Sequence, residues 1–149
     1  MIIREATKED AGQIAAFQME MAMETENLQL DTNLVNKGVQ HVFDDRMKGT
    51  YYVAEKNGKV IASLLTTYEW SDWRNGTILW IQSVYVSPIF RRNGVYRSMY
   101  QHILQLVSEN PELKGIRLYV DQTNLPAREV YKKLGMNAEH YQLFEWLKN

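Results

Sequence analysis

The sequence contains no cysteine, which excludes disulfide bonds and thiolate metal ligands. A covalent mechanism in which an acyl group rests on a cysteine is excluded for the same reason. The 3 histidines, His41, His102 and His140, are scattered, and no His, Asp and Glu residues have the spacing of a metal site. We therefore expect no metal. A chain without disulfides suits a reducing compartment, and we expect a cytoplasmic protein.

The chain also lacks a strong excess of charge and any long apolar run. Its formal net charge is −1, whereas a domain that mainly binds nucleic acid usually carries a large basic excess. No apolar stretch approaches membrane-spanning length. Residues 1–5 do not show the basic start and apolar run of a signal peptide. We therefore expect neither nucleic acid nor a membrane as a partner.

The composition is that of a globular protein, with 45% hydrophobic and 23% charged residues. A length of 149 residues fits one domain but is short for two. No internal repeat, low-complexity segment or linker interrupts the chain. We therefore expect a single domain over residues 1–149.

Hydrophobic periodicity and turn signals divide the chain into alternating helices and strands. We predict, in order, a strand at 1–6, helices at 7–23 and 31–46, strands at 51–54, 60–70 and 77–86, a helix at 96–110, a strand at 116–120, a helix at 124–134 and a last strand at 136–147. Asn57-Gly58 is a strong signal for a two-residue hairpin turn. This order predicts an α/β architecture with a mixed sheet.

The segment 91–96, Arg-Arg-Asn-Gly-Val-Tyr, lies between a predicted strand and an amphipathic helix. Gly94 allows the backbone to approach a ligand closely. The N–H groups and the dipole of a helix N-terminus favour an anion, and Arg91, Arg92 and Arg97 add positive charge. The pattern indicates a diphosphate site. The alternative from the residues alone is an ordinary turn with solvated arginines.

The same segment resembles the signature of the GNAT acetyltransferase family, Arg/Gln-x-x-Gly-x-Gly/Ala after a strand that ends in Val-x-Pro. Here Val86-Ser87-Pro88 precedes the segment, and the resemblance extends in element order from Ile3 to Leu147. It implies the GNAT fold, a mixed central sheet of about six or seven strands flanked by about four helices. It also implies acetyl-coenzyme A as the co-substrate, with its pantetheine arm along the main chain near Val84 and Val86.

Tyr96 departs from the signature, since the family usually has Gly or Ala at this position. A ring there could intrude on the diphosphate. However, Tyr96 also begins the apolar stripe of the following helix. We therefore predict that the ring points to the core while the Tyr96 N–H faces the ligand.

Residues 124–136 resemble a second family segment, Asn-x-x-Ala-x-x-x-Tyr-x-x-x-Gly-Phe, with Met136 in place of Phe. In that family the tyrosine protonates the departing thiolate of coenzyme A, which implies this role for Tyr131. A thiol pKa of about 8.5 and a tyrosine pKa of about 10 make the transfer reasonable. From the residues alone, Tyr131 also suits a core position and Asn124 a helix cap. The resemblance implies that coenzyme A is contacted by Val84, Tyr85, Val86, Arg91, Arg92, Asn93, Gly94, Val95, Tyr96, Asn124, Ala127 and Tyr131.

A protonated amine cannot attack a thioester, so a base must remove a proton. Many family members have a Glu on the fourth strand for this purpose, whereas this strand carries Gln82. A glutamine can order a water but cannot accept the proton at neutral pH. We therefore expect a water-relayed route with Gln82 as a catalytic residue, and Glu69 and Asp72 stay open as alternative bases.

Acidic and aromatic residues suit a cationic amine through charge and cation–π contacts. They occur at Glu20, Glu24 and Glu26 and within 69–73, and we expect both groups at the acceptor site; the plain alternative is a solvated helix and edge aromatics. We expect direct transfer of acetyl to a small-molecule amine. A protein or peptide amine, or a non-catalytic acyl-coenzyme A-binding module, are the alternatives. Many relatives are dimers, so a homodimer is a further open alternative.

Overall fold

The computed structural model describes residues 1–148, which divide into two compact units, one up to Arg117 and one from Leu118 onward. The second unit contains one helix, α4 (Leu125–Lys133), in its described part. The elements of the first unit are β1 (Ile2–Glu5), a 3-10 turn (Lys8–Asp10), α1 (Ala11–Glu26), α2 (Thr32–Asp44), β2 (Thr50–Lys56), β3 (Lys59–Ser71), β4 (Gly76–Val86), a second 3-10 turn (Pro88–Phe90), α3 (Val95–Glu109) and β5 (Leu113–Arg117).

The sheet of the first unit has the strand order β1-β2-β3-β4-β5. β1 to β4 pair antiparallel with their neighbours, and β5 joins β4 in parallel. At the β2–β3 turn, Asn57 and Gly58 have φ values of 52° and 75°. Two successive positive φ angles are what a type I′ hairpin turn requires, so this sequence prediction is confirmed.

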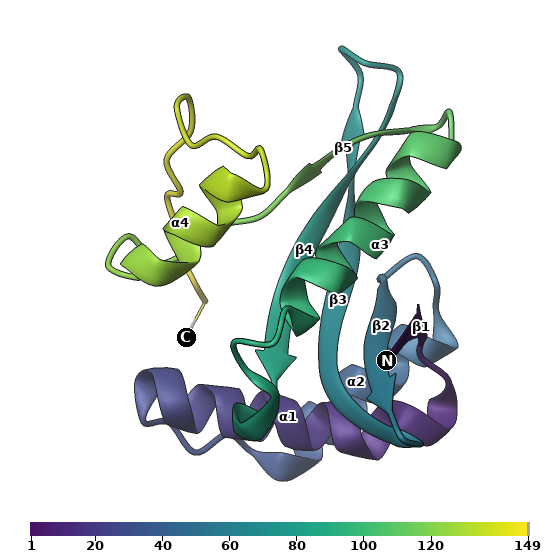
Figure 1. The fold of residues 1–149 in the computed structure, drawn as a ribbon, viewed down its shortest axis with the longest axis vertical. Coiled ribbons are helices and arrows are strands. Elements are labelled where there is room, and N and C mark those ends of the chain that lie inside the picture. Colours follow the sequence, from purple (N-terminus) through teal and green to yellow (C-terminus); the bar gives the residue numbers. More distant parts are fainter. Residues whose placement is uncertain (149) are drawn as a thin grey trace. The chain divides into compact units, whose positions relative to one another are not determined.

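Helices cover both faces of the sheet in the first unit. On one face, Ile14 of α1 and Val39 of α2 pack in one buried cluster with Tyr51, Val53 and Leu65 of the sheet. Side chains alternate along a strand, so the neighbours of these residues point to the opposite face. On that face α3 runs along the front of the sheet (Figure 1) and buries the stripe Val95, Met99, Tyr100 and Ile103.

The prediction of an α/β fold with a mixed sheet is confirmed, but the strand count is lower than expected. The described residues form five strands, and the strand predicted at 136–147 is wrong, because 136–148 form no helix or strand. Every side chain from 137 to 148 is exposed. A strand needs a partner for its main-chain groups, and alternating apolar residues do not supply one.

The fifth strand begins three residues earlier than predicted, at Leu113 rather than Ile116. Its position is set by the parallel register with β4, in which Thr77 pairs with Leu113 and Trp80 with Arg117. Residues 118–120 lie beyond this pairing and form no strand. A pattern of apolar residues locates a strand only to within a few positions, whereas its neighbour fixes the ends.

Candidate functional site

β4 and β5 part about midway along β4. Their pairing in the described chain runs from Thr77–Leu113 to Trp80–Arg117, whereas β4 continues to Val86 alongside β3 alone. The β5-facing edge of β4 from residue 81 onward therefore carries main-chain N–H and C=O groups that β5 does not pair. Such an edge can bind the amides of an extended ligand in the way that another strand would.

A bulge in β4 lies within this open stretch. Ser63 of β3 pairs with Tyr85, but Leu65, two residues on, pairs with Gln82, three residues back, so β4 holds one extra residue. Ser83 in the bulge has φ of 54°, a left-handed conformation that costs a non-glycine residue about 1–3 kcal/mol. The bulge changes the direction of the peptide groups beside Gln82. Sequence reasoning missed Ser83, because its residue type gives no signal for a bulge.

The loop after β4 has the geometry of an anion site. Arg92 and Gly94 adopt left-handed φ values of 64° and 75°, and α3 begins directly afterwards at Val95. The first α-helical hydrogen bond runs from Ser98 N–H to the Gly94 carbonyl at 3.0 Å. The N–H groups of residues 95–97 therefore have no acceptor within the helix. A Cβ added to Gly94 would have no atom within 4 Å, so open space lies above the backbone here.

Tyr96 is half-buried, and its hydroxyl oxygen is buried. The ring therefore turns into the protein, which is the orientation predicted from the apolar stripe of α3. Val95 beside it is buried, whereas residues 91–94 are exposed. The buried Tyr96 hydroxyl is thus turned away from the exposed residues 91–94 of the loop.

Arg91 is held against β4 and α1. Its Nε donates a hydrogen bond to the Val86 carbonyl at 2.8 Å, and its Nη2 donates to Glu24 Oε2 at 2.8 Å. The guanidinium carbon lies 5.2 Å from the centre of the Tyr85 ring. Arg91 therefore connects the loop to both β4 and α1.

Glu69 is engaged through both of its carboxylate oxygens. Trp80 Nε1 donates to Oε1 at 2.7 Å, and Arg117 Nη1 donates to Oε2 at 2.6 Å. These hydrogen bonds, that from Trp80 first, hold the pKa of Glu69 below its usual value. A carboxylate with a lowered pKa is a weak base, so the structure disfavours Glu69 as the proton acceptor.

The two groups of acidic and aromatic residues expected at one acceptor site lie at opposite ends of β4. Glu24 meets the end of β4, whereas Ser71 pairs with Gly76 at its start, in a hairpin that projects from the sheet at the end remote from α1 (Figure 1). Glu69 is hydrogen-bonded to Trp80, five residues before Tyr85, and five residues of a strand span about 17 Å. The structure therefore separates Glu24 from Glu69 along β4, and which of the two groups lies at the acceptor site stays a prediction.

In the second unit, α4 has the local geometry predicted for residues 124–135. The Asn124 side chain accepts a hydrogen bond from the Ala127 N–H at 3.2 Å and so caps the helix. Tyr131 lies one turn after Ala127, and both are half-buried. Gly135, with φ of 90°, ends the helix, and the Met136 N–H returns to the Tyr131 carbonyl at 3.1 Å.

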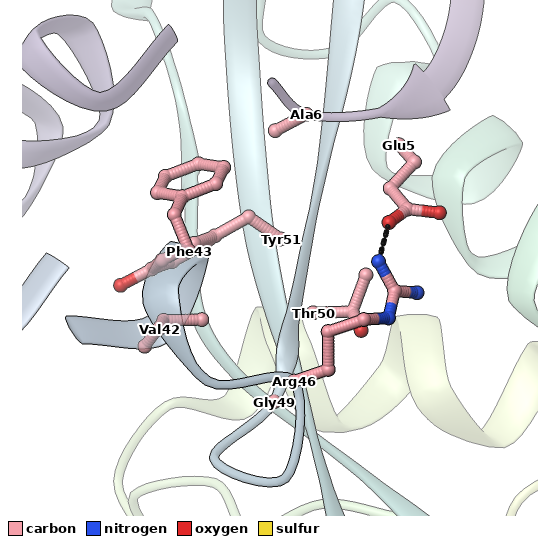
Figure 2. A pocket seen from close by; sticks show the side chains of 8 residues that line it. All are labelled: Glu5, Ala6, Val42, Phe43, Arg46, Gly49, Thr50 and Tyr51. Carbon is pink, nitrogen blue, oxygen red and sulfur yellow. Dashed lines mark hydrogen bonds and ion pairs between the residues drawn. The ribbon is translucent and has the colours of Figure 1, made fainter. Parts of the chain in front are cut away.

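A shallow pocket lies apart from all these residues, between α2, the end of β1 and the start of β2. Figure 2 shows Phe43 and Tyr51 on one side of it and the ion pair of Arg46 with Glu5, at 2.7 Å, on the other. None of the residues predicted for cofactor binding or catalysis lines it.

Residues 1–148 contain no group of three or more His, Asp or Glu side chains placed to hold a metal ion. Within the same residues, every helix is too short or too polar to cross a membrane.

Comparison with known proteins extends these observations. The family model described as the acetyltransferase (GNAT) family matches residues 16–136. An N-alpha-acetyltransferase from Sulfolobus acidocaldarius is 30% identical over 104 residues, which are 61% of this chain and 60% of that protein. The chain thus spans about three fifths of the length of this curated relative.

Solved structures share the fold. The crystal structure of a possible acetyltransferase from Clostridium difficile 630 is 40% identical, with a TM-score of 0.92 over 99% of this chain and 97% of that one. A predicted acetyltransferase from Clostridium acetobutylicum, solved with acetyl-CoA, is 19% identical, with a TM-score of 0.72 over 99% of this chain and 94% of that one. The second likeness concerns the fold alone.

Proposed function

The chain belongs to the acetyltransferase (GNAT) family, and from this premise we propose that it transfers the acetyl group of acetyl-coenzyme A to a primary amine by direct attack. One observation supports the proposal most: β4 leaves β5 after Trp80, bulges at Ser83 and leads into the loop 91–96 at the start of α3. An open strand edge followed by a helix N-terminus suits a ligand with an amide-containing arm and a diphosphate.

The residues of the first unit fit the parts of such a ligand. We assign the diphosphate to the N–H groups at 95–97 and to the left-handed turn at Arg92 and Gly94. We assign the pantetheine arm to the main chain of residues 84–86. Acetyl-coenzyme A supplies the activated acetyl group. The family match from 16 to 136 includes residues of both units, and we propose that they serve one acetyltransferase domain, 1–149.

The amine has to lose a proton before it attacks. We propose that Gln82, half-buried beside the bulge, orders the water that accepts this proton. The two hydrogen bonds to Glu69 make that carboxylate the poorer candidate. For Tyr131 we propose the role that the resemblance implies, donation of its phenolic proton to the departing thiolate, and Asn124 and Ala127 contact coenzyme A from the same helix.

We propose a small-molecule amine as the acceptor, and a peptide amine as the second candidate. The second candidate is favoured by one observation, the 30% identity to an N-alpha-acetyltransferase. Initial rates on a panel of small diamines and aminoglycosides, compared with rates on peptides with a free N-terminus, distinguish the two. A folded protein that binds coenzyme A and acetylates no amine of either class would instead be a binding module.

Thermal unfolding with and without acetyl-coenzyme A tests cofactor binding. A ligand that binds only the folded state at a hundredfold excess over Kd adds about 2.7 kcal/mol of stability. We expect the wild type to show the shift and Gly94→Asp to lose it. Gly58→Asp is the matched control, because Gly58 has the same φ of 75°, also has open space around it, and lies in the β2–β3 turn.

The control separates backbone strain from ligand loss, since both variants force an aspartate into a left-handed conformation. Gly58→Asp should unfold at a lower temperature but keep the full ligand shift. A folded wild type without any shift would overturn the proposal. Equal shifts in Gly94→Asp and the wild type would place the cofactor elsewhere.

A further inference from the structure

The contacts of Arg91 point away from the anion loop to which its main chain belongs. Its Nε donates a hydrogen bond to the Val86 carbonyl and its Nη2 donates one to Glu24, both at 2.8 Å. The guanidinium plane also lies over the Tyr85 ring, at 5.2 Å. Three contacts in different directions give a long side chain a defined position, and they direct it to α1 and β4.

Glu24 connects Arg91 to Tyr85. Its Oε2 accepts from Arg91, and its Oε1 accepts from the Tyr85 hydroxyl at 2.9 Å. The Tyr85 ring is only 4% exposed and packs against Phe17 at 5.1 Å between ring centres. The hydrogen bond from Arg91 lowers the pKa of Glu24, and burial raises the pKa of Tyr85. At neutral pH the carboxylate is therefore ionised and the phenol is a donor.

The contacts of Glu24 hold the C-terminal end of α1 near β4 and the anion loop. Glu24 lies three residues before Asn27, whose φ of 49° terminates the helix. The connection 27–31 that follows is exposed except for Leu30, and the N–H groups of Asn27 and Leu28 return to the carbonyls of Met23 and Ala22. A short exposed connection has few contacts of its own, so its position follows the helix end that carries it.

We propose that Glu24 and Tyr85 are positioning residues that act through Arg91: they fasten the end of α1, and with it the connection 27–31, to the anion loop. We call these contacts of Glu24 with Arg91 and Tyr85 the tie. A ligand bound in the anion loop then restricts the motion of the connection 27–31. Without the tie, the loop and the connection move independently. For the identity of the ligand this inference rests on the proposed function. The tie itself is a property of the first unit without any ligand.

Amide hydrogen exchange without ligand tests the tie. Glu24→Gln removes the charge that holds Arg91, and Tyr85→Phe removes the hydroxyl that holds the other oxygen. We expect the amides of Asn27 and Leu28 to exchange about tenfold faster in Glu24→Gln, with a smaller increase in Tyr85→Phe. Glu26→Gln, a change of the same kind at the same helix end, is the control and should exchange like the wild type. Unchanged exchange in Glu24→Gln would overturn the tie.

The same measurement with saturating acetyl-coenzyme A tests the coupling. In the wild type the ligand should slow exchange both at the loop, residues 93–97, and at residues 27–28. In Glu24→Gln it should slow the loop alone. Slowing at 27–28 that is equal in both proteins would overturn the coupling. If the ligand leaves the wild-type loop unchanged, the proposed function fails, and the ligand-free measurement still decides the tie.

The two KM values, for the amine and for acetyl-coenzyme A, distinguish a positioning role from a general loss of stability. We expect the acceptor site beside Glu20, Glu24 and Glu26, and the tie leaves the anion loop intact, so Glu24→Gln should raise KM for the amine severalfold. KM for acetyl-coenzyme A should stay within about twofold of the wild-type value. A rise confined to KM for acetyl-coenzyme A would identify the Glu24–Arg91 pair as part of the anion site and overturn its role as a tie.

Discussion

Two carboxylates near opposite ends of β4 make the same kind of contacts with different partners. Glu24 accepts from the Tyr85 hydroxyl and from Arg91, and Glu69 accepts from the Trp80 indole and from Arg117. Each thus joins an aromatic donor to a guanidinium. The partners of Glu69 lie on β4 and β5, next to its own strand β3, whereas Glu24 connects a helix end with a strand and a loop.

The difference lies in what each carboxylate holds in place. Main-chain pairing already fixes β3, β4 and β5 around Glu69, so its hydrogen bonds add to an existing structure. Around Glu24 no ladder connects α1 to the loop, and the side chains make the connection. The same chemistry therefore stabilises the sheet at one end of β4 and positions exposed segments at the other.

The largest loss of stability is expected for Gly76→Ala, at the start of β4. A Cβ at Gly76 would lie 2.8 Å from the main-chain oxygen of Glu112 and closer still to the Lys114 side chain, so β4 and β5 would have to separate. We expect a loss of about 2–3 kcal/mol in the free energy of unfolding, measured with urea. Gly94→Ala at the other end meets open space and should lose about 1 kcal/mol, from its left-handed φ alone. Equal losses would contradict the comparison.

Removal of each carboxylate charge gives the next effect. Glu69→Gln removes the ion pair between residue 69 and the partly buried Arg117, and we expect a loss of about 1 kcal/mol in the free energy of unfolding. Glu24→Gln should change overall unfolding less and local exchange at the end of α1 more. Urea unfolding of both variants measures the first quantity. The reverse order of the two losses would show that the helix end, and not the sheet, depends on its carboxylate.

Acidification should release both carboxylates. Hydrogen bonds, from Arg91 to Glu24 and from Trp80 and Arg117 to Glu69, lower the pKa of each group. A group with a lowered pKa in the folded state binds its proton more weakly there than in the unfolded chain. Its stabilisation is present above the usual glutamate pKa and is lost as pH falls below that value, through the lower pKa of the folded state.

The free energy of unfolding measured by urea between pH 7 and pH 3 tests this. The variant with both Glu24→Gln and Glu69→Gln should show a shallower decline than the wild type. Parallel curves of unfolding free energy against pH for the two proteins would mean that neither carboxylate makes these hydrogen bonds in solution.

The smallest effect is expected opposite the bulge. Ser63 is fully buried and pairs with Tyr85, and its hydroxyl has no hydrogen-bond partner in the part of the chain that the structure describes. Replacement of an unsatisfied buried hydroxyl by a methyl group is neutral or favourable. Ser63→Ala should therefore raise the free energy of unfolding by up to about 1 kcal/mol, measured by urea unfolding. A clear loss would show that the hydroxyl is hydrogen-bonded, for example to a buried water.

The features that could be predicted from the sequence depend on local signals. Asn57-Gly58 determines its turn by itself, Asn124 caps its helix within four residues, and Gly94 needs its left-handed φ wherever the loop is placed. The sequence therefore predicts the position of the loop at 91–96 between β4 and α3. The bulge at Ser83 depends on the register of β3 against β4, which single residues do not specify.

The predictions that failed required knowledge of neighbours. Alternating apolar residues at 136–147 are typical of a strand, but pairing decides whether one forms. Glu69 and Glu24 had the same description in the sequence, acidic residues suited to a cationic amine. Their arginine partners, Arg117 and Arg91, lie 48 and 67 residues away along the chain, beyond the range of any local pattern.

The parting of β4 from β5 has a consequence for the protein during synthesis and storage. Between residues 81 and 86 the chain presents an apolar strand with an open edge, and such edges recruit strands from other molecules. A ligand that covers this edge would also protect the protein from aggregation. The solubility of the purified protein should therefore increase when coenzyme A is present, through competition for main-chain groups rather than through any catalytic event.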